Sequence, residues 1–541
     1  MRTIFIELES KQWPSLTRVC RSFFAPAASL VWREIEGVDI IIALIPGVEM
    51  KWSKNAPKRV TRMEFLFETP VDSNRLKVYS LFVRTLEIYG RNAKDYEILN
   101  WRTLAGYAKG GPILPNLLRL TLTTPSWMEA GNQLFWIRTF LSPVLVDIRV
   151  VDLPGRDLPL LRNEMALALL KHISKLASGL RRLSIFIELT DQSGGIEENS
   201  QHIAFWEPSL PDCFATLGSL REISSTSQLL QPDLLPTIAS LKHLEVLKIR
   251  DDGMSAGVFL PFRLVELLDN PFPVLRQLSW FGSDAEETCH VLEGLVLKNL
   301  SRLDLGFTNA PELYDHHHNY WQHQLFKLIS EVCPQLTSLS IDFDNSYDLF
   351  DSAGRSTNAE DMLNYMGRMP LDIVHISQAC LGDDFEEVDS EALAAAWPLV
   401  TKLSLPDTTA TLEGIYKLSR LPKIEVLILK PYFEGISEAF FERTAGVSPL
   451  HTLKASTSSV YLSEMDTDEA ARALVHCWPK IEHYGLDVRP GEDFVDEGGH
   501  EEIMMREANE INAEIQRLRR LSVAEGTEND AESESEEQST N

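Results

Sequence analysis

Residues 334–341 read Pro334-Gln335-Leu336-Thr337-Ser338-Leu339-Ser340-Ile341, and this stretch contains the pattern that decides the fold. Proline stops an incoming helix and favours an extended chain after it. The last two apolar residues of the stretch are two positions apart, so they point to the same side of a strand. The pattern P-x-L-x-x-L-x-L therefore predicts a short strand that buries one face directly after a helix.

Copies of this spacing recur along most of the chain. The clearest have their middle apolar residue at Leu120, Leu183, Leu247, Leu278, Leu303, Leu339, Leu403 and Leu427, weaker ones at Met63, Leu86, Ile148, Val374 and Tyr484, and partial ones at Ile223 and Leu453. Proline lies two residues before the first apolar position at Pro115, Pro143, Pro273, Pro334, Pro398, Pro422 and Pro479. The copies are roughly 23 to 40 residues apart, which is room for one strand and one return segment.

Two of the return segments have helical periodicity. One helix face would hold Leu161, Met165, Leu169, Ile173 and Leu176, and another Ala471, Leu474, Val475 and Trp478, with Asp466 or Thr467 as the cap. One such unit cannot bury its apolar strand face alone, so neighbouring units must stack. The expected result is a parallel sheet with helices on its outer side.

This repeat resembles the leucine-rich-repeat family over about residues 59–490. The resemblance implies an α/β, leucine-rich-repeat-like curved solenoid of about 15 strand–helix units, preceded by a short α-helical segment. The asparagine that the family places after the strand is absent, since Leu305 is followed by Gly306, Phe307 and Thr308. The alternative is an ordinary α/β domain with leucine-rich strands.

The residues before the repeat resemble the second half of an F-box. That family has a V-C-[R/K]-x-[F/W] helix and then a helix ending in L-W-R, which are similar to Val19-Cys20-Arg21-Ser22-Phe23 and Leu30-Val31-Trp32-Arg33. The L-P-x-E helix that opens an F-box is missing between Met1 and Ser10, so either the reading frame starts too late or the domain is degenerate. Alternatively, Pro14, Leu16 and Val19 begin a capping repeat.

F-box proteins with leucine-rich repeats are substrate receptors of cullin-based SCF ubiquitin ligases, and the resemblance implies this role here. A Skp-type adaptor would bind the apolar surface of Leu16, Val19, Cys20, Phe23, Leu30 and Trp32. The solenoid would bind the substrate protein, and the chemistry would belong to other subunits. The alternative function is a leucine-rich-repeat scaffold or ligand-binding protein without a ligase role.

We expect the substrate on the concave sheet face, where side chains between the buried leucines point outward. The predicted substrate-binding residues are Lys248, Arg250, Phe281, Asp304, Asp342, Ile428 and Lys430. Their charge changes from basic to acidic and back to basic, with Phe281 and Ile428 as apolar interruptions. Gly306 and Ser404 are expected to leave room for close approach by a partner.

Composition narrows the function further. A net charge of −28 and a pI of about 4.9 repel nucleic acid and anionic membranes at long range. The six cysteines form no C-x-x-C pair, which indicates reduced thiols in the cytoplasm or nucleus, and no run of 18 apolar residues predicts a membrane span.

Three consecutive histidines, 316–318, with His323 nearby, point in different directions and make a poor metal site. Walker and G-x-S-x-G motifs are absent, so we expect no catalytic residue, metal or cofactor.

The predicted organisation has four parts. Residues 1–50 form a partial F-box-like helical segment, and residues 51–490 form the solenoid. A charged helix within residues 491–522 would cap the last repeat, because a solenoid must cover its terminal apolar face. Residues 523–541 contain acidic but no basic side chains and are expected to be disordered.

Overall fold

A computed structural model of the chain describes residues 21–45, 48–52, 62–67, 74–90, 95–99, 104, 111–123, 130–151, 158–188, 209–250, 270–309, 319–343, 356–357, 359–377, 380–381, 390–433, 436, 438–446, 448–456, 466–487 and 505–521. The chain divides into two compact units, Met1–Leu275 and Arg276–Asn541. Fifteen parallel strands follow in sequence order, seven in the first unit and eight in the second.

The first unit is built on parallel strands, each hydrogen-bonded to the next. They are β1 (Glu34–Glu36), β4 (Thr85–Glu87), β6 (Arg119–Thr123), β7 (Asp147–Val151), β8 (Arg182–Ser184), β9 (Glu222–Ser225) and β10 (Val246–Arg250). The middle leucine or isoleucine of each repeat lies in register with that of the next, as Leu120 does with Ile148. These side chains are fully buried, so the repeat spacing produces one continuous apolar ladder.

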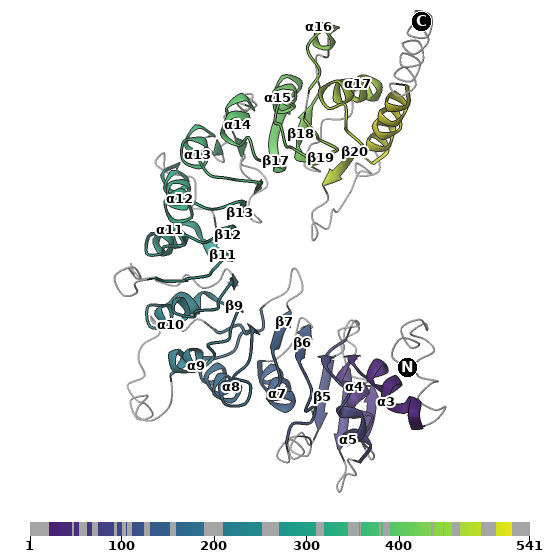
Figure 1. Cartoon of the computed structure of the whole chain (residues 1–541), viewed down its shortest axis with the longest axis vertical. Helices are drawn as coiled ribbons and strands as arrows, with labels where there is room; N and C mark the ends of the chain where they lie inside the picture. The colour runs from purple at the N-terminus through teal and green to yellow at the C-terminus, as the bar shows by residue number, and fades with distance from the viewer. Residues whose placement is uncertain are drawn as a thin grey trace, which may run out of the picture. The chain divides into compact units, whose positions relative to one another are not determined.

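A helix precedes the first strand of the first unit, and further helices return the chain between its strands. They are α3 (Arg21–Val31), α4 (Val38–Ile42), α5 (Asn74–Ser80), α7 (Ala130–Phe140), α8 (Asn163–Leu176), α9 (Leu210–Thr216), the 3-10 helix Ser227–Leu230 and α10 (Leu235–Ala239). Helices α7 to α10 lie on one side of the parallel strands (Figure 1). Helix α8 buries Ala166, Leu169, Leu170 and Ile173, so an apolar stripe of the helix is buried, but Leu176, which the periodicity placed on the same face, is 42% exposed.

The weak copy centred on Met63 is not a strand of the main sheet. Strand β3 (Arg62–Phe67) pairs antiparallel with β2 (Val48–Trp52) and parallel with β5 (Asp95–Leu99), in a separate three-stranded sheet. Phe65 of this sheet is buried and stacks on Tyr96 with ring centroids 5.3 Å apart. Strand-like alternation of apolar residues is common to both arrangements, so spacing alone assigned this segment to the wrong sheet.

The second unit continues the same alternation. Its parallel strands are β11 (Gln277–Asp284), β12 (Arg302–Asn309), β13 (Ser338–Phe343), β15 (Ile373–Ser377), β17 (Lys402–Thr411), β18 (Val426–Tyr432), β19 (Thr452–Ser456) and β20 (His483–Asp487). Its helices are α11 (Ala285–Glu293), α12 (Asn319–Val332), α13 (Ala359–Met366), α14 (Ser390–Ala396), α15 (Leu412–Leu418), α16 (Glu438–Phe441) and α17 (Thr467–Cys477). A two-residue pair, β14 (Ser356–Thr357) and β16 (Cys380–Leu381), forms a small separate sheet. The alternation of parallel strands and return helices in both units confirms the predicted leucine-rich-repeat-like α/β solenoid.

A C-terminal helix over residues 505–521 packs beside the last strand. The Asn512 side chain accepts the Tyr484 backbone N–H at 2.8 Å and donates to the Tyr484 carbonyl at 2.6 Å. Gln516 donates to the Glu482 carbonyl at 3.2 Å, and Ile511 and Ile515 are fully buried. One amide side chain thus gives β20 the donor and acceptor that a further strand would provide.

Candidate functional site

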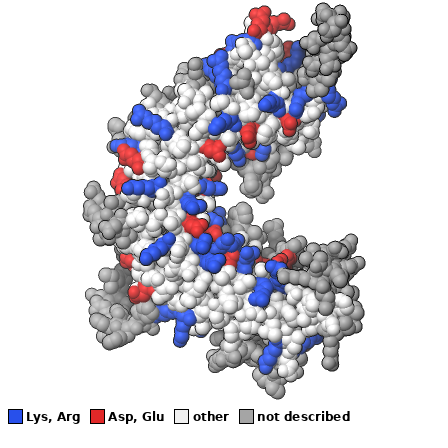
Figure 2. Space-filling view, viewed as in Figure 1, with Lys and Arg blue, Asp and Glu red and all other residues white. Residues whose placement is uncertain are grey.

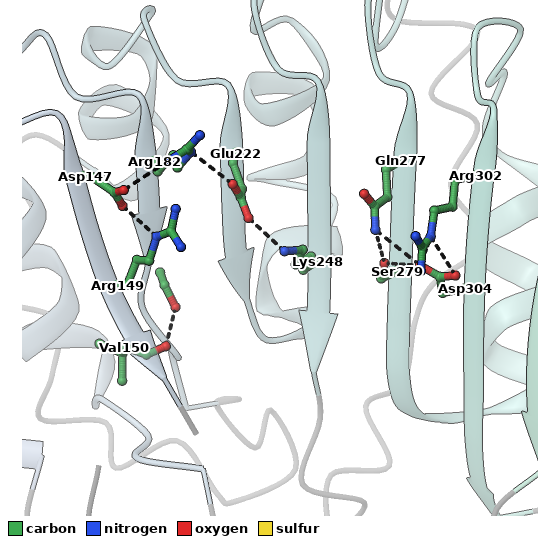
Figure 3. A network of polar contacts seen from close by, with 11 residues as sticks. Asp147, Arg149, Val150, Arg182, Glu222, Lys248, Gln277, Ser279, Arg302 and Asp304 are labelled. Atoms are coloured by element: carbon green, nitrogen blue, oxygen red, sulfur yellow. Dashed lines mark hydrogen bonds and ion pairs between the residues drawn. The ribbon is translucent and has the colours of Figure 1, made fainter. Parts of the chain in front are cut away.

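In the first unit, charged side chains of alternating sign cross the exposed face of the sheet. Arg119, Asp147, Arg182 and Glu222 occupy the first position of strands β6 to β9, in register. Parallel strands are about 4.8 Å apart, so each side chain reaches its neighbour. Lys248, two positions into β10, extends the row (Figure 3). We call these five residues the charge ladder.

Asp147 is the centre of the charge ladder. Its side chain is only 3% exposed, yet Arg119 Nε, Arg149 Nε and Arg182 Nη1 lie 3.1, 3.0 and 3.2 Å from its carboxylate oxygens. The three guanidinium groups satisfy the charge that burial would otherwise leave unpaired. This carboxylate therefore holds three arginine side chains in fixed positions on the sheet.

The ladder continues through Glu222 to the next strand. Arg182 Nε lies 3.3 Å from one Glu222 oxygen, and Lys248 Nζ lies 2.8 Å from the other (Figure 3). The sheet face thus presents paired charges. Basic and acidic side chains also lie next to one another on the side of the molecule that Figure 2 shows. A paired and ordered polar surface needs little rearrangement before it binds a partner.

A second polar network lies on the sheet of the second unit. Asp304 accepts hydrogen bonds from Ser279 Oγ at 2.8 Å, Arg302 Nε at 2.9 Å and Gln277 Nε2 at 3.3 Å (Figure 3). The Asp304 side chain is 7% exposed, whereas that of Arg302 is 56% exposed. The network therefore presents the guanidinium to solvent and keeps the carboxylate beneath it.

Hydrogen bonds also link the following strands of this unit. Ser377 of β15 donates to Asp342 of β13, and His375 of β15 lies 2.7 Å from Ser404 Oγ of β17. The polar residues on this face are therefore cross-linked laterally. No group of three or more metal-ligating side chains occurs within the described residues. His323 of α12 lies 2.9 Å from the Tyr365 hydroxyl of α13, while histidines 316–318 fall outside the described residues.

The predicted substrate-binding residues differ in how much surface they offer. Lys248 is paired with Glu222, Asp342 accepts from Ser377, and burial lowers the pKa of Arg250. Phe281 is 37% exposed, and Lys430 is partly exposed. Two residues are less available than expected, because Asp304 and Ile428 are each only 5% exposed.

The predicted open space beside Gly306 and Ser404 is filled. A Cβ on Gly306 would lie 2.5 Å from Cδ1 of the Phe281 ring, so this ring covers the glycine. Ser404 is fully buried against His375. Glycine in the strand is therefore explained by packing of a neighbouring aromatic ring rather than by approach of a partner.

Sequence reasoning missed most of the charge ladder. The predicted substrate-binding row began at Lys248 and used only residues that follow the middle apolar position of each repeat. The residues left out were Arg119, Asp147, Arg182 and Glu222. Each of these residues directly precedes the middle apolar residue of its repeat. Charged residues of alternating sign at that position in consecutive repeats were the available signal.

The predicted adaptor surface is only partly described. Leu16, Val19 and Cys20 lie outside the described residues, whereas Phe23 and Leu30 are partly exposed on α3. Trp32 follows α3, and its ring centroid lies 4.6 Å from that of Tyr79 in α5. Phe24 also contacts α5 and its flank, with ring centroids 5.9 Å from Tyr79 and 6.3 Å from Phe82. Part of the predicted apolar surface is thus used inside the chain.

Comparisons with known proteins assign no family to this chain. No family model matches the sequence, and no curated protein matches it. A yeast Rad7–Elc1 complex is 16% identical over 61% of this chain and 86% of the other, with a TM-score of 0.30. A TLR13–ssRNA13 complex is 13% identical over 75% of this chain and 54% of the other, with a TM-score of 0.30. An internalin from Listeria monocytogenes is 12% identical over 70% of this chain and 82% of the other, with a TM-score of 0.26. At these values the assignment rests on the strands and helices of the chain itself.

None of the described helices has the length and apolar character that crossing a bilayer requires. The four cysteines whose side chains are described, Cys213, Cys289, Cys333 and Cys477, are buried free thiols. Burial raises the pKa of Cys333 and Cys477 to about 12.

Proposed function

We propose that this chain is a protein-binding substrate receptor of a cullin-based SCF ubiquitin ligase. Its N-terminal helices would dock a Skp-type adaptor, and the sheet face of the solenoid would bind the substrate protein. The observation that carries the protein-binding role is the ordered row of paired charges on the exposed sheet, anchored by Asp147. Such a face offers complementary charges to a protein partner.

The ligase role is supported by sequence more than by geometry. Val19-Cys20-Arg21-Ser22-Phe23 and Leu30-Val31-Trp32-Arg33 resemble the F-box, and α3 begins and ends within these two motifs. Leu30 and Phe23 keep part of their surface exposed, as an adaptor contact requires. Binding energy at such contacts is concentrated in a few apolar anchors.

A scaffold without a ligase role is the second candidate, and one contact favours it. The Trp32 ring packs against the Tyr79 ring, so this aromatic residue contributes to the packing of the N-terminal helices. If its role is only internal, replacement will lower stability without a separate effect on adaptor binding. The two candidates therefore predict different outcomes for the same variants.

Affinity measurement with a purified Skp-type adaptor tests the proposal. The full chain should bind the adaptor, and Leu30→Ala should weaken binding at unchanged melting temperature. Trp32→Ala should weaken it further than Tyr79→Ala, which removes the same internal stacking without removing the predicted anchor. No adaptor binding by the wild-type chain, also when any in-frame upstream F-box helix is included, would refute the ligase role.

A separate experiment tests the sheet face. After proximity labelling has found a partner, Phe281→Ala and Asp342→Lys should weaken its binding. Lys171→Glu and Lys175→Glu, on the outer helix α8, serve as the control. Loss of binding in the helix variants alone would place recognition elsewhere.

A further inference from the structure

A cavity of the first unit lies between α3 and the sheet. Its volume is about 910 Å³, and its lining includes six arginines but only two carboxylates, Glu34 and Asp147. This excess of positive charge is found in a chain whose net charge is −28. All of its basic lining residues are arginines, whose planar fork suits carboxylate and phosphate groups.

The cavity floor contains the residue that directly precedes each strand, and we call these residues the pre-strand row. In strand order they are Arg33, Arg84, Leu118, Val146, Arg181 and Arg221. From Arg84 onward, each donates its backbone N–H to the carbonyl of the one before it, at 2.7 to 3.0 Å. The row therefore runs across the strands as two cations, two apolar residues and two cations.

The cations of the row differ in how far they are already neutralised. Arg221 pairs with Glu245 at 3.2 Å, and Arg33 lies 3.9 Å from the exposed Glu34. The Arg84 side chain donates to the Asn116 carbonyl at 3.3 Å. Among the described residues, no carboxylate lies within ion-pair distance of Arg84 or Arg181. Both side chains are exposed and available to an anion.

The distance between these two arginines limits the ligand. They lie three strands apart, which is about 14 Å at the usual strand spacing. An extended peptide covers this backbone distance in about four residues, so it can place one anionic side chain beside each arginine. The apolar Leu118 and Val146 lie between them, and Leu30 and Phe82 add further apolar lining.

We propose that this cavity binds an extended peptide segment of a partner protein, in which an apolar side chain lies between two anionic residues about four positions apart. The anionic groups contact Arg84 and Arg181, and the apolar group contacts Leu118 and Val146. Arg119 and Arg182 are held by Asp147, so that carboxylate is neutralised and does not repel the segment. This inference rests on the protein-binding part of the proposed function and names the class of segment that is bound.

Fluorescence anisotropy with synthetic peptides and the purified full chain tests the proposal. The probe peptide has a leucine midway between two glutamates four positions apart, and a second arm replaces the glutamates with phosphoserine to distinguish carboxylate from phosphate. Arg84→Ala and Arg181→Ala should each weaken binding about tenfold, since each removes a charge-assisted contact. Arg276→Ala is the matched control, because Arg276 is an exposed arginine that also directly precedes its strand but belongs to the second unit.

Further peptides, one charge-reversed variant and a small polyanion test the apolar contact and the pairing of Arg181. Replacing the leucine by serine should weaken binding, and Arg181→Glu should recover affinity for a peptide with lysine at the matching position. Equal binding of the serine peptide, or inorganic tripolyphosphate binding as tightly as the peptide, would instead indicate a site for small polyanions and overturn the proposal. Absence of binding by both anionic peptides would also overturn it. The peptide measurements contain no adaptor, so a loss of peptide binding does not bear on adaptor binding or on the ligase role.

Discussion

Replacing Asp147 by asparagine removes the charge at the centre of the ladder while keeping the shape of the side chain. Breaking a fully buried ion pair costs about 3–5 kcal/mol, and an exposed pair contributes about 0–1 kcal/mol. Asp147 is buried, but its three arginine partners are 40 to 48% exposed, so solvent screens them once the carboxylate is lost. We therefore expect a cost of about 1.5–3 kcal/mol, between these limits.

Hydrogen–deuterium exchange can measure this cost locally, without assuming that the whole chain unfolds in one step. Peptides covering β6 to β8 should exchange faster in Asp147→Asn, by a factor that corresponds to the lost free energy of opening. Glu245→Gln is the control, since its ion pair with Arg221 is 40 to 54% exposed and should change exchange little. Equal effects of the two substitutions would refute the view that burial makes Asp147 the anchor of the ladder.

Three further predictions concern the core, one partly buried carboxyl group and the thiols. Leu247→Ala and Leu303→Ala, at positions 1% and 0% exposed, should each cost about 2–5 kcal/mol in urea unfolding, and a cost near zero for both would mean that the repeat leucines are not the core. Burial raises the pKa of Glu87, so its protonated form is favoured in the folded state and its ionisation destabilises the fold as pH rises through the glutamate range. Glu87→Gln should therefore raise the melting temperature at pH 7 and have a smaller effect near pH 4, and the reverse order would contradict this. Cys333 and Cys477 should resist iodoacetamide at pH 8 until denaturant is added, because their pKa of about 12 leaves little thiolate; rapid labelling of the native chain would show that they are accessible.

The apolar spacing of the repeats predicted most of the main sheet. Leu120, Ile148 and Leu183 were identified as middle residues, and they lie side by side on successive strands. Such prediction succeeds because a one-residue shift of register would move every leucine to the wrong face. The same rule failed for residues 62–67, since alternation does not state which strand is the neighbour.

Candidate functional residues were harder to identify than core residues. The outward position of Asp304 followed from alternation, but its burial depends on Ser279, Gln277 and Arg302, which come from two neighbouring strands. Likewise, Gly306 looked open in sequence and is covered by the Phe281 ring. Exposure of an outward side chain is set by what adjacent strands place beside it, and that information is not local in sequence.

The sequence by itself determined the repeating unit, because proline, the spaced leucines and the helical stripes act within about 30 residues of one another. Only the tertiary structure decided which charges meet. Arg119 and Arg182 are 28 and 35 residues from Asp147 along the chain, yet a guanidinium nitrogen of each lies within 3.2 Å of the Asp147 carboxylate. Stacking also brings Arg84 and Arg181 to one cavity with two apolar residues between them. Local sequence fixes what each repeat buries, whereas the binding surface arises from the lateral register between repeats, which exists only after they have stacked.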